Sequence, residues 1–428
     1  MKIPPVKGTR DFFPSEMAIR NFIVDGWKQA SVRNGFEEYD GPIFEYLKMY
    51  QIKSGDEIAE QLFNLTDRGG RDLAIRPEIT PTLARMVNQQ INSLARPIKW
   101  FSVPRLCRAE RPQKGRLREF FQWNIDIIGV EDVTADAEVI FTTVDYLRQV
   151  GLTSDDIKVK ISSRKLLAAF LKSLGIPEKN LDTIYTLLDK KAKLPPETFE
   201  KLLVEQIADS DKVSKILDFM SVSNISELPK DNEEIEGSVD ELAILFNTLR
   251  QMGIDSYCKF DPGIVRGLAY YTGVVFEVHE AGGELRAIAG GGRYDNLLKQ
   301  FGGPQVTGTG MGMGDCVLEI LLEEKKLLNF KTRKLDYYIA SIVEALSDDR
   351  SIEITAKLRT LGFLAERNYK TVNLKKQLKS ASDLNAKYCV ILGDELQDNL
   401  LLIKDMGTGQ QQQVDIDTFF DQLETESK

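Results

Sequence analysis

Three strand-like segments follow one another in the first third of the chain, and they restrict the fold more than any other feature. They are residues 71–80 (RDLAIRPEIT), 98–108 (IKWFSVPRLCR) and 118–129 (REFFQWNIDIIG). Their β-branched and aromatic residues favour strands, and we expect no helix between them. Successive strands without crossover helices favour an antiparallel sheet over a doubly wound parallel one. The chain is therefore predicted to have an α+β fold built on an antiparallel sheet.

Helical patterns lie on both sides of these strands along the chain. One starts at Ser15 and another covers residues 134–151, each with apolar residues at helical spacing on one face. Strand-like residues return at 267–280 and 285–294, and the glycines between them predict a hairpin. A further helical pattern covers residues 315–328. We therefore expect helices to flank the sheet.

Two other regions differ in character from this core. Residues 164–252 carry helical patterns separated by prolines, glycines and charge runs, which predicts a helical insertion. After a linker at 329–334, strands and helices alternate, as in a small α/β domain. The predicted organisation is a core in two parts, 1–163 and 253–329, a helical insertion at 164–252, and an α/β domain at 334–428.

Composition and charge exclude several classes of function. The formal charge of −9 over 428 residues excludes a wholly basic nucleic-acid coat protein, but not an enzyme with a local basic surface. The single histidine and four scattered cysteines form no side-chain motif for a metal centre. That histidine, His279, is interpreted as a strand-end residue without a role in catalysis. Because no leader-like or membrane-spanning apolar run is present, we expect a cytoplasmic protein with no membrane partner.

The segment from 105 to 118 is strongly basic and joins two of the predicted strands. Its six positive residues, set against the single acid Glu110, are Arg105, Arg108, Arg111, Lys114, Arg116 and Arg118. Guanidinium groups suit phosphate oxygens and nucleic-acid backbones. A solvated charged hairpin explains the same pattern. Charge alone leaves both interpretations open.

Other candidate residues also have structural explanations. Tyr270 and Tyr271 suit either a binding site or an ordinary strand. Glu78, which follows a proline, suits the first turn of a helix. Asp126 lies in an apolar stretch where an unpaired charge is costly, which favours a functional role.

Several separated motifs, taken together, resemble a known family. They are GTRDFFP at 8–14, RPEITP at 76–81, CRAERPQKGRLREFFQW at 107–123, IVRGLAYYTGVVFEV at 264–278 and AGGGRYDNL at 289–297. In this order they resemble class II aminoacyl-tRNA synthetases, and the RGLAYY and GGRYD segments resemble histidyl-tRNA synthetase in particular. The resemblance implies an antiparallel catalytic core flanked by helices, a helical insertion and a C-terminal anticodon-binding domain.

The resemblance also implies which residues bind ATP. Arg108 matches the position on the α-phosphate, Glu110 the position near the adenine amino group, and Arg116 the position at the distal phosphates. Phe120 matches the residue that stacks on adenine, and Arg266 matches the catalytic arginine beside the reacting carboxylate. Arg108 is also expected to act in catalysis, and Mg²⁺ is expected with ATP.

Histidine and tRNA contacts follow from the same resemblance. The positions that match histidine-binding residues are Glu78, Thr80, Gln122, Asp126, Tyr271 and Tyr294. Gln113 and Lys114 lie in the loop expected to meet the acceptor end of tRNA(His). Lys375 and Lys376 lie in a basic patch of the C-terminal domain, which is either an anticodon contact or a solvated helix face. Pro42 matches the proline of a dimer-forming motif, so a homodimer is expected.

Two positions depart from the family pattern. Ala269 stands where many members have Asp, and Asp315 stands where the third class II motif places an arginine that clamps the γ-phosphate. A carboxylate cannot replace that arginine directly. Asp315 is expected to cap a helix, to bind magnesium or to pair with Arg116.

The implied activity is that of a histidine–tRNA ligase. Histidine would react with ATP to give histidyl-adenylate and pyrophosphate, and would then pass to the 3′-hydroxyl of the terminal adenosine of tRNA(His). One alternative is a non-catalytic, synthetase-like regulatory subunit of ATP phosphoribosyltransferase that senses histidine. The other is a class II synthetase for a different amino acid. Retention of Arg108, Glu110, Arg266 and the extra domain favours the ligase.

Overall fold

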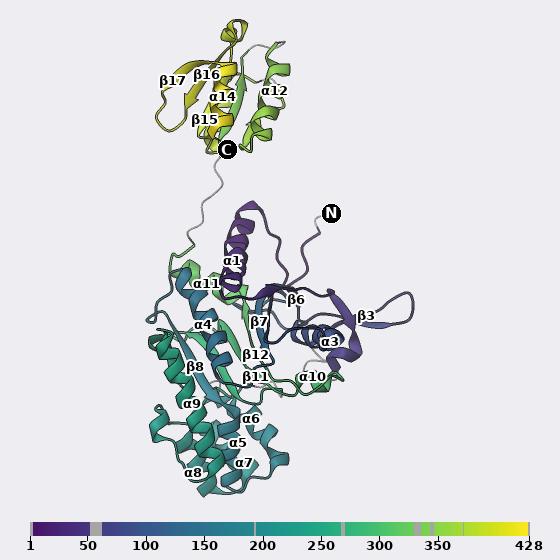
Figure 1. Ribbon diagram of the computed structural model, residues 1–428, viewed down its shortest axis with the longest axis vertical. Helices are drawn as coiled ribbons and strands as arrows, with labels where there is room; N and C mark the ends of the chain where they lie inside the picture. Colours follow the sequence, from purple (N-terminus) through teal and green to yellow (C-terminus); the bar gives the residue numbers. More distant parts are fainter. Residues whose placement is uncertain are drawn as a thin grey trace. The chain divides into compact units, whose positions relative to one another are not determined.

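The computed structural model describes residues 3–51, 62–191, 194–266, 270–328, 335–342, 346–370 and 372–426. The chain forms two compact units, Met1–Phe330 and Lys331–Lys428 (Figure 1). The linker expected at 329–334 and the departure at Ala269 lie outside the described residues.

A mixed sheet, antiparallel at its centre, forms the core of the first unit, as the sequence predicts. Its strands lie in the order β1 (Glu37–Glu38), β5 (Ile98–Ser102), β7 (Glu119–Ile128), β12 (Gly308–Gly314), β11 (Ala289–Tyr294), β10 (Val274–Glu280), β8 (Ile157–Ser163) and β9 (Cys258–Phe260), with β6 (Arg105–Cys107) also paired to β7. Neighbours from β5 to β8 run antiparallel, whereas the outer pairs β1–β5 and β8–β9 run parallel.

The long strand β7 has two different faces. Trp123, Ile125 and Ile127 are fully buried in the main hydrophobic core. Because successive side chains of a strand point to opposite faces, Asn124 and Asp126 turn the other way. The second face of β7 is therefore polar although it is buried.

Helices α1 (Pro14–Arg33), α4 (Thr134–Gln149) and α11 (Asp315–Glu324) cover the apolar face of the sheet (Figure 1). The Trp27 and Trp123 rings stack at 6.3 Å, and Tyr146 meets Trp123 edge-on at 5.5 Å. The indole N–H of Trp123 donates to the Ser31 hydroxyl at 2.8 Å. These contacts hold α1 and α4 against β7.

One expectation about this region is wrong, because a helix does lie between the first two predicted strands. The segment 71–80 forms strand only over β4 (Asp72–Ile75), and α3 (Thr80–Gln90) follows. Proline at the second helical position suits a helix start, and Leu83 and Val87 share its buried face. The connection to β5 is therefore helical.

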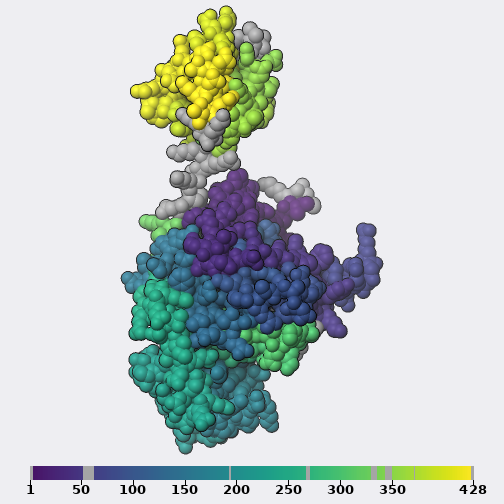
Figure 2. All heavy atoms as spheres, viewed as in Figure 1, coloured from purple at the N-terminus to yellow at the C-terminus, as the bar shows by residue number. Residues whose placement is uncertain are grey.

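A three-stranded antiparallel sheet, β2 (Phe44–Tyr46), β4 and β3 (Phe63–Thr66), lies beside this helix. In Figure 2 the hairpin of β3 and β4 stands out from the surface of the first unit. The short helix α10 (Leu297–Gln300) packs on α3.

The segment from 164 to 252 is helical in its described part, and its helices lie together in Figure 1. They are α5 (Arg164–Ser173), α6 (Leu181–Leu188), α7 (Pro196–Ile207), α8 (Ser210–Phe219) and α9 (Glu233–Gln251), with short 3₁₀ turns at Glu178–Asn180 and Ile225–Glu227. A further 3₁₀ turn at Asp255–Tyr257 follows this segment. The Phe170 and Phe219 rings stack at 4.2 Å between α5 and α8. Helix α9 packs on α4 and so joins these helices to the core.

The second unit is a five-stranded sheet with helices, in agreement with the predicted α/β domain. Its strands lie in the order β14 (Ala365–Arg367), β13 (Tyr337–Ser341), β15 (Tyr388–Leu392), β16 (Leu400–Asp405) and β17 (Gln411–Asp415). Its helices are α12 (Leu346–Thr360), α13 (Leu374–Asp383), α14 (Ile416–Glu426) and a 3₁₀ turn at Asp394–Asp398. Strands β14, β13 and β15 are parallel, and the rest are antiparallel.

A buried ion pair ties β11 to α4 and β12. Arg293 and Asp136 are 4% and 0% exposed, and the Arg293 Nε atom donates to Asp136 at 2.9 Å. Thr309 donates to the other carboxylate oxygen at 2.7 Å, and Arg293 also reaches the Val130 carbonyl at 2.9 Å. Burial raises the pKa of Asp136 to about 6 against the opposing attraction of Arg293.

Asp136→Ala leaves the Arg293 guanidinium buried without its carboxylate. We expect the free energy of unfolding to fall by about 3–5 kcal/mol, measured by denaturant titration. Glu38→Ala, which removes an exposed pair with Lys28 at 2.6 Å, is the control and should change little. Unchanged stability of the Asp136 variant would show that the buried pair does not hold these elements together.

Candidate functional site

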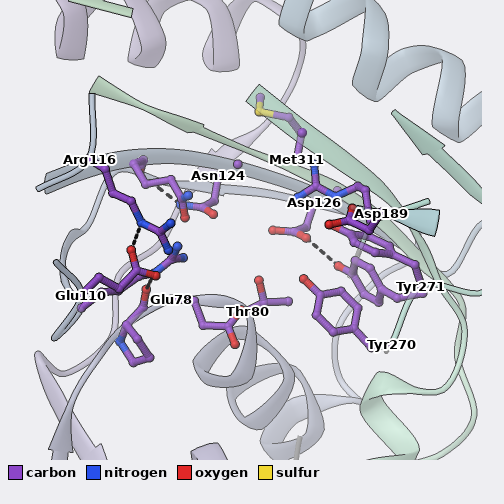
Figure 3. A pocket seen from close by; sticks show the side chains of 18 of the residues that line it. Glu78, Thr80, Glu110, Arg116, Asn124, Asp126, Asp189, Tyr270, Tyr271 and Met311 are labelled. Carbon is purple, nitrogen blue, oxygen red and sulfur yellow. Dashed lines mark hydrogen bonds and ion pairs between the residues drawn. The ribbon is translucent and has the colours of Figure 1, made fainter. Parts of the chain in front are cut away.

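Two adjoining hollows open on the polar side of the sheet. The first has a volume of about 470 Å³ and the second of about 730 Å³. Arg108, Glu110, Arg116, Gln122 and Arg266 line both, so the two form one continuous site. Figure 3 shows the first hollow with acidic and aromatic side chains at one end and Arg116 with Glu110 at the other.

The aromatic end is built around a buried carboxylate. The Tyr294 hydroxyl donates to Asp126 Oδ1 at 2.6 Å, and both residues are buried. Burial and the nearby Asp126 charge raise the pKa of Tyr294 well above its usual value, so its hydroxyl keeps its proton. A Cβ atom on Gly310, the cross-strand partner of Asp126, would lie 2.1 Å from Asp126 Oδ1. The carboxylate therefore needs glycine beside it.

Two further tyrosines complete this end. The Tyr270 and Tyr271 rings lie 4.6 Å apart, and Tyr270 meets Tyr294 edge-on at 6.2 Å. Burial, followed by the charges of Tyr271 and Glu78, raises the pKa of Tyr270 well above its usual value. The end therefore combines aromatic faces with hydroxyl donors and one carboxylate acceptor.

Glu78 and Thr80 stand at the start of α3 between the two ends of the first hollow (Figure 3). Glu78 is buried, and its charge opposes the lowering of the Arg108 pKa that burial causes. The Arg108 Nε atom donates to the Pro77 carbonyl at 3.0 Å. This bond fixes the guanidinium over the Phe120 ring, 5.2 Å from its centroid.

Arg266 occupies the junction of the two hollows in a strained backbone conformation. Its φ is 52°, a left-handed conformation that costs a non-glycine residue about 1–3 kcal/mol. Arg164, at the start of α5, donates to the Arg266 carbonyl at 2.9 Å and so supports this conformation. The Arg266 Nε atom is buried without a hydrogen-bond partner among the described residues. A buried, unpartnered donor on a cation suits an anionic ligand.

The Arg266 guanidinium packs directly on the backbone of β11. A Cβ atom on Gly290 would lie 1.5 Å from Arg266 Nη1, so no other residue fits there without moving the arginine. Glu277 lies 3.4 Å from the same nitrogen. The position of the guanidinium thus depends on the Glu277 carboxylate and on glycine at position 290.

Most of the residues predicted from the sequence meet in this site. Ten line the first hollow: Glu78, Thr80, Arg108, Glu110, Arg116, Gln122, Asp126, Arg266, Tyr271 and Tyr294. Phe120 lines the second. Arg116 forms an ion pair with Glu110.

The residues predicted to touch tRNA lie outside both hollows. Gln113 accepts a hydrogen bond from Arg286, and Lys114 is exposed and lies 3.2 Å from Glu324. Lys375 and Lys376 are exposed on α13 of the second unit. Pro42 is exposed beside β2.

Asp315 lines neither hollow. Its carboxylate pairs with Arg10 and accepts from the Phe121 amide at 3.0 Å. It is the first residue of α11, whose N-cap is Gly314, so it is not the cap. The expected pairing with Arg116 is also wrong, because Arg116 pairs with Glu110. Asp315 instead anchors the N-terminal GTRDFFP segment.

The structure adds residues that sequence reasoning missed. Thr186, Asp189 and Lys190, from the helical segment, line the first hollow together with Asn124 and Met311. Arg286 and His279 line the second. His279 lies at the end of β10, as the sequence predicts, and its Nε2 atom lies 2.9 Å from Glu277 Oε2 in the second hollow. No local motif marks these positions, although the period-two pattern of β7 already placed Asn124 beside Asp126.

No helix in the described ranges is both long and apolar enough to cross a membrane.

Comparisons with known proteins identify the family. Residues 8–314 match the histidyl-tRNA synthetase family, and residues 336–426 match the anticodon binding domain. The chain is 40% identical to the histidine–tRNA ligase of Opitutus terrae, covering 94% of this chain and 93% of that protein. It is 39% identical to the chloroplastic/mitochondrial histidine–tRNA ligase of Arabidopsis thaliana, and the alignment covers 96% of this chain and 85% of that protein.

A solved structure agrees with this result. The histidyl-tRNA synthetase from Nostoc sp. PCC 7120 shares the fold with a TM-score of 0.81 at 23% identity, over 100% of both chains. The family matches, the near-complete alignments and the shared fold lead to one conclusion: the chain belongs to the histidyl-tRNA synthetase family.

Proposed function

We propose that the two hollows bind histidine and ATP side by side, and that the chain joins histidine to tRNA(His) in two steps. The observation that carries the proposal is the position of Arg266 at the junction of the two hollows. There its guanidinium meets both a carboxylate in the first hollow and a phosphate in the second. The first step forms histidyl-adenylate and releases pyrophosphate. The second transfers histidine to the 3′-hydroxyl of the terminal adenosine.

The aromatic end of the first hollow reads the imidazole ring. The Asp126 carboxylate accepts a ring N–H, while Tyr271 and Tyr294 present hydroxyls to the ring. A side chain without such groups would leave these buried polar atoms unpaired, which is how hydrogen-bonding sites reject wrong substrates. Glu78, Thr80 and Gln122 hold the α-amino group, for which the Glu78 carboxylate supplies the opposite charge.

The second hollow binds ATP. Phe120 stacks on adenine, Glu110 lies near the adenine amino group, Arg108 binds the α-phosphate and Arg116 reaches the distal phosphates. Arg108 lies 5.2 Å from the Phe120 ring centroid, so the two side chains can contact different parts of one nucleotide, whose ribose joins the base to the α-phosphate. The distance between these two side chains supports their assignment to one ligand.

The reaction needs positioned positive charge more than acid–base catalysis. The histidine carboxylate attacks the α-phosphorus, the bond to the bridging oxygen breaks, and pyrophosphate leaves with that electron pair. Arg108 and Arg266 stabilise the negative charge that develops on the phosphate oxygens. Both are held before substrate arrives, Arg108 by the Pro77 carbonyl and Arg266 by Gly290 and Glu277. Little reorganisation is therefore required during the step.

Magnesium is expected to enter with ATP. Mg²⁺ in such sites is bound by one or two carboxylates together with substrate phosphates and water. Glu110 and Glu277 are the carboxylates that line the second hollow, and the Glu277 oxygens already contact Arg266 and His279. Glu277 would therefore share an ion held mainly by the phosphates of ATP and by water, and the bound ion would neutralise phosphate charge.

Two features support the tRNA assignments. Gln113 and Lys114 lie in the exposed turn between β6 and β7, where an acceptor end can reach the first hollow. Lys375 and Lys376 lie on α13 within the matched anticodon binding domain.

Residues 1–163 and 253–329 form the catalytic core, 164–252 the insertion and 334–428 the anticodon-binding domain. The setting is the cytoplasm.

A homodimer is supported by an apolar surface on the three-stranded sheet. Ile43, Phe44, Tyr46 and Leu65 are 60%, 55%, 56% and 45% exposed. They follow Pro42, which matches the dimer-forming motif. An exposed apolar group of this kind is typical of a protein–protein interface. In the proposed homodimer a second copy of the chain covers this surface.

The activity is tested by histidine-dependent exchange of pyrophosphate into ATP without tRNA. We expect exchange, and we expect Arg266→Ala to lower its rate by about 10²–10³-fold while the histidine Kd changes little. Gly290→Ala should reproduce this loss, because its methyl group displaces the Arg266 guanidinium. A protein that binds histidine without exchange would identify the regulatory subunit instead, and normal exchange in both variants would remove Arg266 from the reaction.

Replacing Lys375 and Lys376 with alanine should raise the KM for tRNA(His) in aminoacylation and leave pyrophosphate exchange unchanged. The effect should grow as salt is lowered, because phosphate contacts depend on counterion release. Arg350→Ala, an exposed change in the same unit that removes a local pair with Glu353, serves as the control. If both variants aminoacylate like the wild type, α13 is a solvated helix face.

Phe44→Glu places a charge in the exposed apolar surface without disturbing a buried residue. We expect the dimer to dissociate, which analytical ultracentrifugation detects as a halved mass. Val32→Glu, at an equally exposed apolar position on α1, is the control and should remain dimeric. A dimeric Phe44 variant would place the interface elsewhere.

A further inference from the structure

The second hollow contains a fourth arginine, to which the sequence analysis assigned no role. Arg286 lies in the connection between β10 and β11 and lines the hollow with Arg108, Arg116 and Arg266. It is exposed, and no ion pair joins it to a carboxylate of the described residues. Its charge is therefore available to a ligand.

A neutral side chain orients this guanidinium. Arg286 Nη2 donates to Gln113 Oε1 at 2.6 Å. Gln113 and Arg116 exchange two backbone hydrogen bonds of 2.9 Å across the tip of the β6–β7 connection. Arg286 therefore reaches the turn that carries Arg116, the residue assigned above to the distal phosphates. The amide of Gln113 fixes the group without neutralising it.

The start of α11 supplies no cation to the same hollow. Gly314, Cys316 and Val317 line it, and none of them carries a positive charge. Asp315, at the place where the family pattern has the γ-phosphate arginine, is occupied with Arg10. The hollow thus lacks a cation on its α11 side and has an additional one on the β10–β11 connection.

We propose that Arg286 binds the β- and γ-phosphates of ATP and supplies, from the β10–β11 connection, the charge that the family pattern places on α11. The inference rests on the ATP site proposed above. Four guanidinium groups and two carboxylates, Glu110 and Glu277, line the second hollow. The excess of positive charge matches the net negative charge of a magnesium–ATP complex. Without Arg286 the hollow would have less positive charge where the β- and γ-phosphates are proposed to lie.

The experiment compares two ligands that differ in their distal phosphates. Arg286→Ala should weaken ATP binding at least about tenfold, since a charge-assisted contact contributes about 1.5–3 kcal/mol. A sulfamoyl analogue of histidyl-adenylate, which has no β- or γ-phosphate, should bind as it does to the wild type. Calorimetry with the full chain measures both affinities, and Arg286→Lys should restore part of the ATP affinity. In exchange assays the KM for ATP should rise while that for histidine stays constant.

Arg111→Ala is the matched control, because Arg111 is an exposed arginine of the same basic loop that lines neither hollow. It should leave both affinities unchanged. If Arg286→Ala weakens the binding of ATP and of the analogue equally, the proposal is overturned and Arg286 has a structural role. Unchanged ATP affinity with a raised KM for tRNA would overturn it in favour of a tRNA contact. If the wild-type chain binds ATP with the expected Arg286 dependence but shows no exchange, the proposed function fails and the phosphate assignment stands.

Discussion

The site depends on two charged side chains that pack against bare backbone. Arg266 lies on Gly290 of β11, and Asp126 lies on Gly310 of β12, at distances that leave no room for a methyl group. Antiparallel pairing of β7, β12 and β11 brings these positions together and fixes their register. The same pairing sets the aromatic end of the first hollow beside the arginine-lined second hollow. The alignment of the two hollows is thus a property of the sheet.

Buried polar groups hold this sheet together behind the site. Arg293 belongs to the same strand as Tyr294, and its contacts to Asp136 and to carbonyls of the loop before α4 fix where that strand lies. Taking such a pair out of water is costly, so its contribution to stability is smaller than its contacts suggest. Its geometry nevertheless permits one placement of β11 relative to α4. The Arg293–Asp136 pair therefore fixes the position of Tyr294, and with it the Tyr294–Asp126 hydrogen bond, from behind the site.

The sequence predicts the sheet, its flanking helices and most of the site, for reasons that differ between residues. Asp126 could be identified because a charge in an apolar strand needs a partner, whereas the basic residues before β7 could be placed in the site only through the family resemblance, since their charge also suits a solvated hairpin. Helix α3 was missed because the strand pattern of 72–75 was extended to residue 80, past Pro77 and up to the Pro81 that suits a helix start. The burial of Leu83 and Val87 shows the helical face. Arg286, His279 and Asp189 were missed because their roles depend on which loops meet in space. The partner of Asp315 is 305 residues distant, too far for any local pattern to indicate.

That long separation bears on how the protein is made. Arg10 leaves the ribosome near the start of synthesis, whereas Asp315 emerges only after nearly all of the first unit. Until then the N-terminal segment can contact only early parts of the core, such as the Arg118 amide, which donates to the Gly8 carbonyl at 2.8 Å, and the α11 side of the second hollow does not exist. Strands β10, β11 and β12 arrive late for the same reason, after the helices of the insertion have been translated. The second hollow, which residues of β10, β11 and β12 line, is therefore among the last parts of the first unit to be completed, and a nascent chain released before β10 would lack it.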